Sequence, residues 1–190
     1  MRLLVVRHGE TKANSEARYN GHADSPLTPM GQRQAEELSV RVATLGPEII
    51  YRSDLARVSA TVKPLVTRTG LPVRVDLRLR ELDFGRIEGL TYTEAMELFK
   101  VEIQDWYGDI EHRTPPGGEA LAKMRERVYA FLADLVEQPF KTVALFTHGG
   151  VCNLLLAKAT KTAFGSVWLR PGEFRELHLT GKRDHWHLDS

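Results

Sequence analysis

Two histidines stand where α/β proteins commonly present catalytic groups. His8 follows the apolar run 3–6 and His148 follows a second apolar run, 143–146; each histidine is followed by a glycine. Both runs are too short to form independent helices and contain β-branched residues, so they predict buried strands. In open α/β sheets, ligands bind beyond the carboxyl ends of the strands. We therefore expect the two strand ends to be neighbours, with both imidazoles facing one reaction centre.

Imidazole and guanidinium groups together suit chemistry on an anion. Neutral imidazole is a competent nucleophile near pH 7, and arginine offers a planar fork of donors that matches phosphate. Arg7 directly precedes His8, and Arg57 follows the end of another predicted strand. Gly9 allows a ligand to approach the main chain closely. A histidine or an arginine alone is as readily a structural or solvated group, but this combination indicates an anion-binding centre.

The elements that must position these residues alternate along the chain. We predict strands at 3–6, 48–51, 73–75, 143–146, 174–179 and 185–188, and helices at 29–45, 54–69, 92–106, 119–137 and 151–159. Strands that alternate with helices imply a mostly parallel sheet covered on both faces. The last two strands are expected to be antiparallel. The predicted fold class is α/β, a three-layer sandwich with a mostly parallel six-stranded sheet, in a single domain over residues 1–190.

Local signals set the expected limits of the helices. The pair Thr28-Pro29 is typical of an N-cap and a first helical position. Thr91 and Glu94 have the spacing of a capping box. We expect Ser53 to cap the next helix, which should begin near residue 54. Pro64 should kink or break that helix, because proline lacks the backbone N–H that a helix interior needs.

Composition narrows the class of protein. The chain has 190 residues, of which 42% are hydrophobic and 27% charged, with a formal net charge of +1. This balance does not indicate nucleic acid or membrane as a partner. The single cysteine, Cys152, fits a reducing compartment and is interpreted as a buried, inert thiol. The N-terminal apolar run is too short for a signal peptide and no stretch approaches transmembrane length, so we expect a cytoplasmic protein.

Taken in order, the motifs resemble those of the histidine phosphatase superfamily, the phosphoglycerate mutase-like proteins. They are Arg7–Thr11 with Asn14, Gly21, Leu27-Thr28 with Gly31, Ser53–Arg57 with Thr61, Glu81–Gly89, Pro116–Glu119 and Thr147–Gly150. An isolated Arg-His-Gly is weak evidence, whereas this ordered set covers nearly the whole chain. Ala13 replaces an aromatic residue that is usual in the family and is expected to alter the shape of the pocket. Pro64 is also less typical of its helix.

The resemblance implies that His8 attacks phosphorus and becomes a phosphohistidine. A covalent intermediate divides one difficult displacement into two. The charge on the phosphate oxygens would be stabilised by preorganised donors. The resemblance assigns these donors to Arg7, Asn14, Arg57 and His148.

The resemblance also assigns a proton carrier and two glycines to the site. Glu81 would protonate the leaving oxygen and then take a proton from water; without the resemblance we would interpret it as a surface ion pair. Gly21 and Gly149 complete the expected substrate-binding set. Gly149 opens a helix, whose N-terminal amides add positive potential.

We predict a metal-independent phosphomonoesterase that needs no cofactor and acts on a small-molecule phosphate ester. His185 and His187 alternate along a terminal strand and are interpreted as solvated rather than as metal ligands. Trp106 and Tyr107 lie in the region where this family varies its specificity. Arg80 is interpreted as a solvated charge that could reach the tail of a substrate.

Two alternatives stay open. A cofactor-dependent phosphoglycerate mutase would return the phosphoryl group to a bound phosphoglycerate, but the chain is shorter than such mutases usually are. A catalytically silent module that binds phosphorylated ligands need not keep the nucleophile, whereas His8, Glu81 and His148 are all present. Two segments, 84–89 and 115–119, look most like the α-ribazole phosphatase group and are shared with broad-specificity phosphatases. A homodimer is expected from the family.

Overall fold

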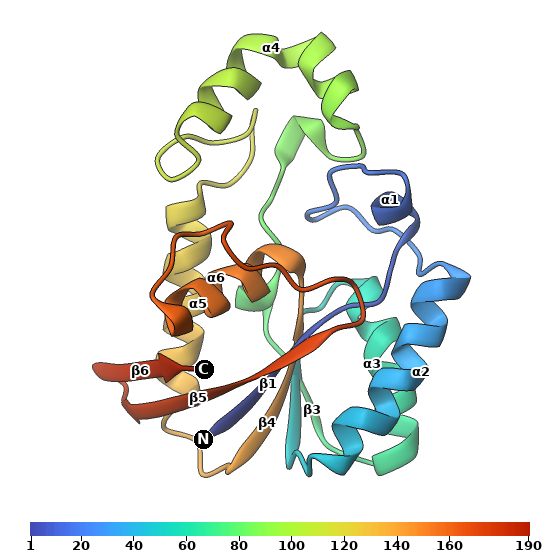
Figure 1. Ribbon diagram of the computed structural model, residues 1–190, viewed down its shortest axis with the longest axis vertical. Helices are drawn as coiled ribbons and strands as arrows, with labels where there is room; N and C mark the ends of the chain where they lie inside the picture. Colours follow the sequence, from blue (N-terminus) through green and yellow to red (C-terminus); the bar gives the residue numbers. More distant parts are fainter.

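The two apolar runs that precede the histidines form adjacent parallel strands in the middle of a six-stranded sheet (Figure 1). The computed structural model describes residues 1–190. Strand β1 (Arg2–Arg7) pairs with β4 (Thr142–Thr147), and their last residues, Arg7 and Thr147, lie opposite each other. The predicted meeting of the two strand ends is therefore confirmed.

The remaining strands extend this central pair on both sides, in the order β3-β2-β4-β1-β5-β6. Strands β2 (Ile49–Arg52) and β3 (Val73–Val75) run parallel to β4. Strand β5 (Phe174–Lys182) is antiparallel to β1, and β6 (His185–Asp189) is antiparallel to β5. The prediction of a mostly parallel six-stranded sheet is confirmed.

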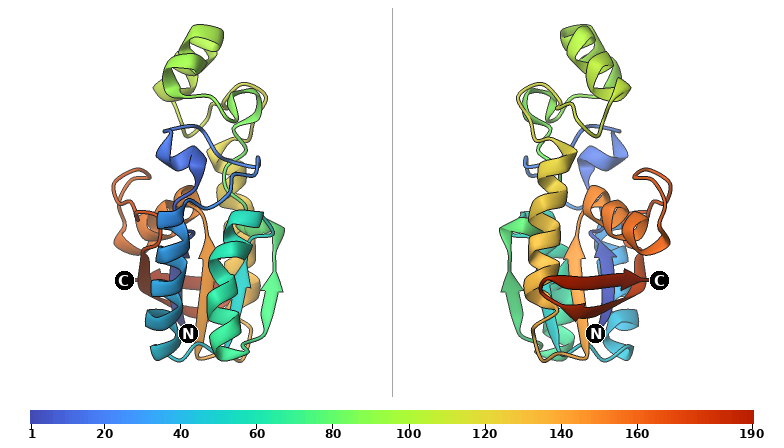
Figure 2. Two further views of the ribbon diagram at one scale, coloured as in Figure 1. Left: turned by 90° about the vertical axis from the view of Figure 1, so that its right-hand side faces the viewer. Right: turned by 90° about the vertical axis from the view of Figure 1, so that its left-hand side faces the viewer.

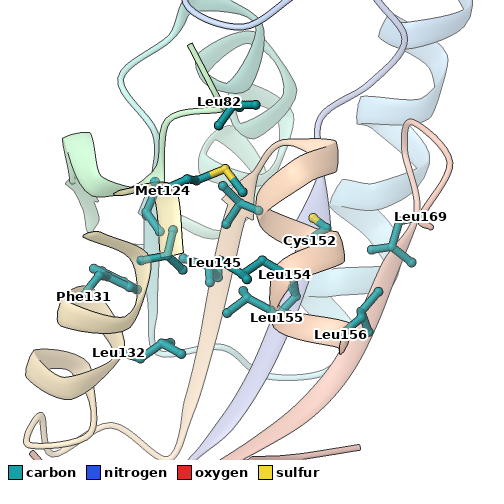
Figure 3. Packing of buried hydrophobic residues seen from close by; sticks show 14 of the residues in the cluster. Leu82, Met124, Phe131, Leu132, Leu145, Cys152, Leu154, Leu155, Leu156 and Leu169 are labelled. Carbon is teal, nitrogen blue, oxygen red and sulfur yellow. The ribbon is translucent and has the colours of Figure 1, made fainter. Parts of the chain in front are cut away.

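Helices cover both faces of the sheet. Helices α2 (Pro29–Thr44) and α3 (Ala56–Thr69) pack together on one face, over the side chains of Leu4 and Val6. Helices α5 (Leu121–Leu135) and α6 (Gly149–Thr160) bury their apolar faces on the other, in one cluster with Leu3 and Val5. Phe131 of α5 and Leu155 of α6 belong to this cluster (Figure 3). Because successive side chains of a strand point to opposite faces, one apolar strand serves both cores. The three-layer α/β sandwich is confirmed.

Helix α4 (Tyr92–Gly108) stands apart from these layers, beyond the carboxyl ends of the parallel strands (Figure 2). The capping box predicted for Thr91 and Glu94 is present. Phe99 interrupts the helix with non-helical angles, φ −135° and ψ 38°. A short helix α1 (Lys12–Ser15) and two 3₁₀ turns, η1 (Leu77–Leu79) and η2 (Gly85–Ile87), lie in the connections below α4. No helix is long and apolar enough to cross a membrane.

The beginning of α3 differs from the prediction. The helix begins at Ala56 after Leu55, two residues later than expected, and Leu55 has no side-chain cap. Ser53 accepts only a long hydrogen bond of 3.4 Å from the Leu55 N–H. The Ala56 N–H instead donates to Asp24 Oδ1 at 3.2 Å. Asp24, in a distant loop, thus provides the acceptor that was expected from Ser53. The local sequence around the helix does not indicate this contact.

A kink or a break was expected at Pro64, and the helix does not break there. Proline stands inside α3, which continues to Thr69. The carbonyl that Pro64 leaves without a helical donor belongs to Ala60, four residues earlier. Ala60 is exposed, so water can satisfy its carbonyl.

Candidate active site

The two predicted histidines face each other at the carboxyl edge of the sheet. Their ring centroids are 5.3 Å apart and their planes meet at 66°. His8 follows β1 and is 3% exposed, and His148 is the fully buried N-cap of α6. The two apolar strands therefore place both rings in one water-poor centre.

The main chain fixes the tautomer of His8. Its Nδ1 lies 2.7 Å from the carbonyl oxygen of Gly9. Because a carbonyl oxygen only accepts, Nδ1 carries the proton and Nε2 keeps a free lone pair. Gly9 must be a glycine, since a Cβ there would lie 2.5 Å from the carbonyl oxygen of Gly31. This geometry leaves His8 Nε2 able to act as a nucleophile.

His148 has the opposite tautomer. Arg57 Nε donates to His148 Nδ1 at 3.2 Å. Nδ1 is therefore an acceptor and Nε2 carries the proton. His148 Nε2 and Arg7 Nε are both buried without a protein partner. Buried donors are normally paired, so the site offers two N–H groups to an incoming acceptor.

Burial and positive charge keep both rings neutral. The pKa of His8 falls from 6.5 to about 3, mainly because burial disfavours the charged ring and then because Arg57 lies close. The same two causes hold the pKa of His148 well below its ordinary value. Burial also lowers the pKa of Arg57. An unprotonated His8 is the form that can attack phosphorus.

The depressed His8 pKa predicts a pH-dependent stability. Below pH 6.5 the unfolded chain takes up a proton on His8 that the folded protein excludes until about pH 3. The unfolded state binds more protons in this window, so stability falls as pH falls. Between pH 7 and pH 5 the free energy of unfolding should drop by about 2 kcal/mol through His8 alone. Urea titrations at both pH values should show this drop, and His8→Asn should lose that part of it.

Arg57 reaches across the site to the loop before α2. It is 1% exposed, and its terminal nitrogens donate to the carbonyl oxygens of Ala23 at 2.9 Å and Gly21 at 2.6 Å. A Cβ at Gly21 would lie 2.2 Å from the carbonyl oxygen of Leu82. The structure thus brings Gly21 to Arg57 through its main chain, and Arg57 joins that loop to His148.

Arg7 and Gly149 are packed against each other. Arg7 Nη1 donates to the carbonyl oxygen of Leu169 at 2.6 Å. A Cβ on Gly149 would lie 3.0 Å from Arg7 Cζ. The missing side chain of Gly149 therefore lets the guanidinium lie against the start of α6.

Glu81 lies on the same edge, with its carboxylate against the first turn of α6. It is 8% exposed. Oε2 accepts from the Gly150 N–H and Oε1 from the Leu82 N–H, both at 2.9 Å. A Cβ on Gly150 would lie 2.3 Å from Oε1. The second glycine of the Gly-Gly pair thus makes room for a carboxylate beside the histidines.

A cavity of about 320 Å³ opens above this centre. Its lining includes Arg7, Asn14, Glu81 and Gly149. Asn14 is fixed by the capping box of α1, in which its Oδ1 accepts from the Thr11 N–H at 3.1 Å. Four predicted site residues thus line one cavity, whereas His8, His148, Arg57 and Gly21 lie outside its lining.

The walls of this cavity are aromatic. Trp106 and Tyr107 lie in them, and Tyr107 Oη is 2.7 Å from Tyr19 Oη. The complete set of aromatic lining residues is Tyr19, Phe84, Trp106, Tyr107, Phe164 and Trp168. Arg80 does not line the cavity, and its Nε donates to Asp54 Oδ1 at 2.8 Å. A substrate tail in this cavity would meet rings rather than the Arg80 guanidinium.

Sequence reasoning assigned no role to Glu88. Its two carboxylate oxygens accept four backbone N–H groups at 2.9–3.2 Å, from Gly21, His22, Ala23 and Phe84. This carboxylate holds the loop whose carbonyls bind Arg57. The only local signal is an acidic residue in the glycine-rich segment 85–89.

The other predicted features are simpler. His185 and His187 are exposed on β6, and Cys152 is a buried free thiol. No group of three or more His, Cys, Asp or Glu side chains is placed to hold a metal ion.

A mostly parallel six-stranded sandwich with this site at its carboxyl edge has the phosphoglycerate mutase-like fold. The sequence profile of the histidine phosphatase superfamily (branch 1) matches residues 3–188, and the chain belongs to this family. The resemblance found in the motifs is thereby confirmed.

Several relatives carry a functional name. The adenosylcobalamin/alpha-ribazole phosphatase of Escherichia coli K12 is 32% identical over 169 residues, which are 88% of this chain and 83% of that protein. A probable phosphoglycerate mutase GpmB of Klebsiella pneumoniae is 36% identical over 155 residues, which are 80% and 70% of the two chains.

Solved structures show the same likeness. The alpha-ribazole phosphatase of Shigella flexneri superposes with a TM-score of 0.89 at 29% identity, covering 99% of this chain and 94% of its own. A mycobacterial glucosyl-3-phosphoglycerate phosphatase in complex with VO3 has a TM-score of 0.84 at 31% identity, with coverages of 99% and 96%. The family and these relatives support a phosphatase.

Proposed function

We propose that the protein is a metal-independent phosphomonoesterase that hydrolyses a small phosphorylated metabolite through a phosphohistidine on His8. The observation that carries the proposal is the tautomer of His8. Nδ1 of His8 is bound to the main chain, which leaves the lone pair of Nε2 free. The ring of His148, whose Nε2–H has no protein partner, lies 5.3 Å away, measured between the ring centroids. A nucleophile and a buried, unpaired donor side by side suit attack on a tetrahedral anion.

In the proposed first step, His8 Nε2 attacks phosphorus and the bond to the ester oxygen breaks. The leaving oxygen takes a proton from Glu81. In the second step, water attacks the phosphohistidine and gives its proton to Glu81, and the N–P bond breaks to release phosphate. Arg7, Arg57 and His148 stabilise the charge on the phosphate oxygens in both steps, because buried preorganised donors act strongly on developing charge.

The cavity walls favour a leaving group with a flat, apolar part. The aromatic rings of the cavity walls offer large apolar surfaces to such a group. Arg18 also lines the cavity, but its guanidinium is paired with Glu16 at 2.8 Å and Glu94 at 2.7 Å. The carboxylate of a phosphoglycerate would have to compete for that charge. We therefore propose an α-ribazole phosphatase-like specificity, since α-ribazole carries a planar aromatic base.

A phosphoglycerate mutase is the second candidate, because relatives with that probable name reach 36% identity. The deciding experiment measures phosphate release from a panel of esters that includes α-ribazole 5′-phosphate and 3-phosphoglycerate, with and without 2,3-bisphosphoglycerate. We expect release without the bisphosphate and the highest kcat/KM for α-ribazole 5′-phosphate. Interconversion of phosphoglycerates that requires the bisphosphate would favour the mutase. Binding of esters without turnover would favour a silent phospho-ligand-binding module.

Activity is expected to survive exhaustive treatment with EDTA. In the proposed mechanism, Arg7 and Arg57 supply the positive charge that a metal ion supplies in many phosphatases. The measurement is phosphate release by the protein before and after chelation and dialysis. A loss that divalent ions restore would contradict the proposed mechanism.

Three further expectations stay predictions. They are the assignment of residues 1–190 to a single domain, a cytoplasmic location and a homodimer. Light scattering coupled to gel filtration would test the last of these.

A further inference from the structure

The segment that leads to Glu81 is irregular, and one side chain from α5 binds its main chain. Arg127 Nη1 donates to the carbonyl oxygens of Arg78 at 2.8 Å and Arg80 at 2.6 Å. Its Nη2 donates to the carbonyl oxygen of Glu81 at 2.9 Å. Three carbonyls within four residues therefore depend on a single guanidinium.

Glu119 holds that guanidinium in place. Its two carboxylate oxygens accept from Arg127 Nε and Nη2, each at 2.7 Å. The two side chains are only 19% and 18% exposed. The Glu119 N–H donates to the carbonyl oxygen of Asp83 at 2.8 Å. The Arg127–Glu119 pair thus binds the chain on both sides of Glu81, and the five guanidinium donors of Arg127 make five hydrogen bonds.

We propose that Arg127, oriented by Glu119, is a positioning residue for proton transfer by Glu81. The inference rests on the proposed general-acid role of Glu81. A proton donor works only within hydrogen-bond reach of the leaving oxygen, and small displacements of a reacting group cost large factors in rate. His8 follows β1 and His148 caps α6, and neither histidine makes a hydrogen bond to Arg127. Loosening the pair should therefore impair protonation of the leaving group more than attack on phosphorus.

The test compares two substrates that differ in their need for a proton. An alkyl phosphate has a poor leaving group, whereas p-nitrophenyl phosphate has a good one. Arg127→Lys keeps the charge but loses the planar fork. We expect kcat/KM for the alkyl phosphate to fall about 10-fold or more, and the burst-phase rate with p-nitrophenyl phosphate to change by less than about 3-fold. Combined with Glu81→Gln, the variant should add little further loss, because both changes act on one proton transfer.

Arg125→Lys is the matched control. Arg125 lies on the same helix and is paired with Glu111, with Nη2 2.7 Å from Oε2. It makes no hydrogen bond to the segment before Glu81. Both substrates should be hydrolysed by this variant as by the wild type, so a general effect of replacing an arginine on α5 is separated from the effect on Glu81.

Equal losses on the two substrates in a folded Arg127→Lys protein would overturn the proposal, and so would losses that multiply with those of Glu81→Gln. If Arg127→Lys does not fold, Glu119→Gln decides by the same comparison, since it keeps one acceptor for Arg127. A different outcome bears on the proposed function. A wild-type protein that releases phosphate from no ester would contradict the proposed phosphatase activity. Equal losses on the two substrates in Glu81→Gln would contradict the proposed general-acid role of Glu81.

Discussion

A His8→Ala protein is expected to fold and to lose turnover by roughly 10⁴-fold or more, the scale seen when a covalent nucleophile is removed. His8 lies beyond the last residue of β1, so its removal leaves the pairing of β1 with β4 intact. The folded state should be checked by circular dichroism and thermal unfolding. His185→Ala is the matched control, because His185 is exposed on β6 and should be dispensable. Substantial activity in a folded His8→Ala protein would contradict the mechanism.

The wild-type reaction should also leave a chemical trace on His8. Rapid quenching in alkali should preserve a phosphoryl group on the protein, and acid should remove it, because the N–P bond of phosphohistidine is acid-labile. Peptide mapping should place the adduct on His8. His148 carries its proton on Nε2 in the folded protein, so it is not expected to be labelled. A stable adduct on another residue would show that this residue, and not His8, is the nucleophile.

Glu81→Gln is expected to slow the hydrolysis of an alkyl phosphate by a factor of about 10² to 10⁴, the usual contribution of a general acid. Glutamine keeps the shape of the side chain but has no transferable proton. Its carbonyl oxygen can still accept from one of the two backbone amides, Leu82 or Gly150, that the carboxylate binds. The measurement is kcat/KM for an alkyl phosphate in the two proteins.

The same variant should behave differently with p-nitrophenyl phosphate. Nitrophenol has a pKa of roughly 7, so nitrophenolate can leave without being protonated. The first step should therefore be slowed much less. Water attack on the phosphohistidine then limits the rate, and we expect a burst of nitrophenol before slow turnover. Equal losses in the burst-phase rate for both substrates would show that Glu81 only positions the phosphate or its loop.

Local patterns predicted the parts of the fold that local chemistry decides. The apolar runs around 3–6 and 143–146 became the central strands because strands buried on both faces can be apolar throughout. The capping box at Thr91 formed because its donors and acceptors lie within one turn. The same strand signals placed the histidines together before any contact between them was known.

The remaining parts depend on contacts between distant segments. The start of α3 is decided by Asp24, which is 32 residues from Ala56. Glu88 binds amides up to 67 residues away, and Arg127 binds carbonyls 46 to 49 residues away. Composition and periodicity cannot report which loop carbonyls a side chain will meet. The reacting groups of the site could therefore be predicted from the sequence, whereas the contacts that support them could not.

The place of β1 in the sheet constrains how the chain can fold during its synthesis. Its two neighbours are β4 and β5, which begin at residues 142 and 174. At 5–20 residues per second, a ribosome needs about 7 to 28 s to add the roughly 140 residues before the first partner is complete. Throughout that interval the wholly apolar segment Leu3–Val6 has no strand to pair with. An apolar segment left unpaired for so long makes the incomplete chain prone to aggregation.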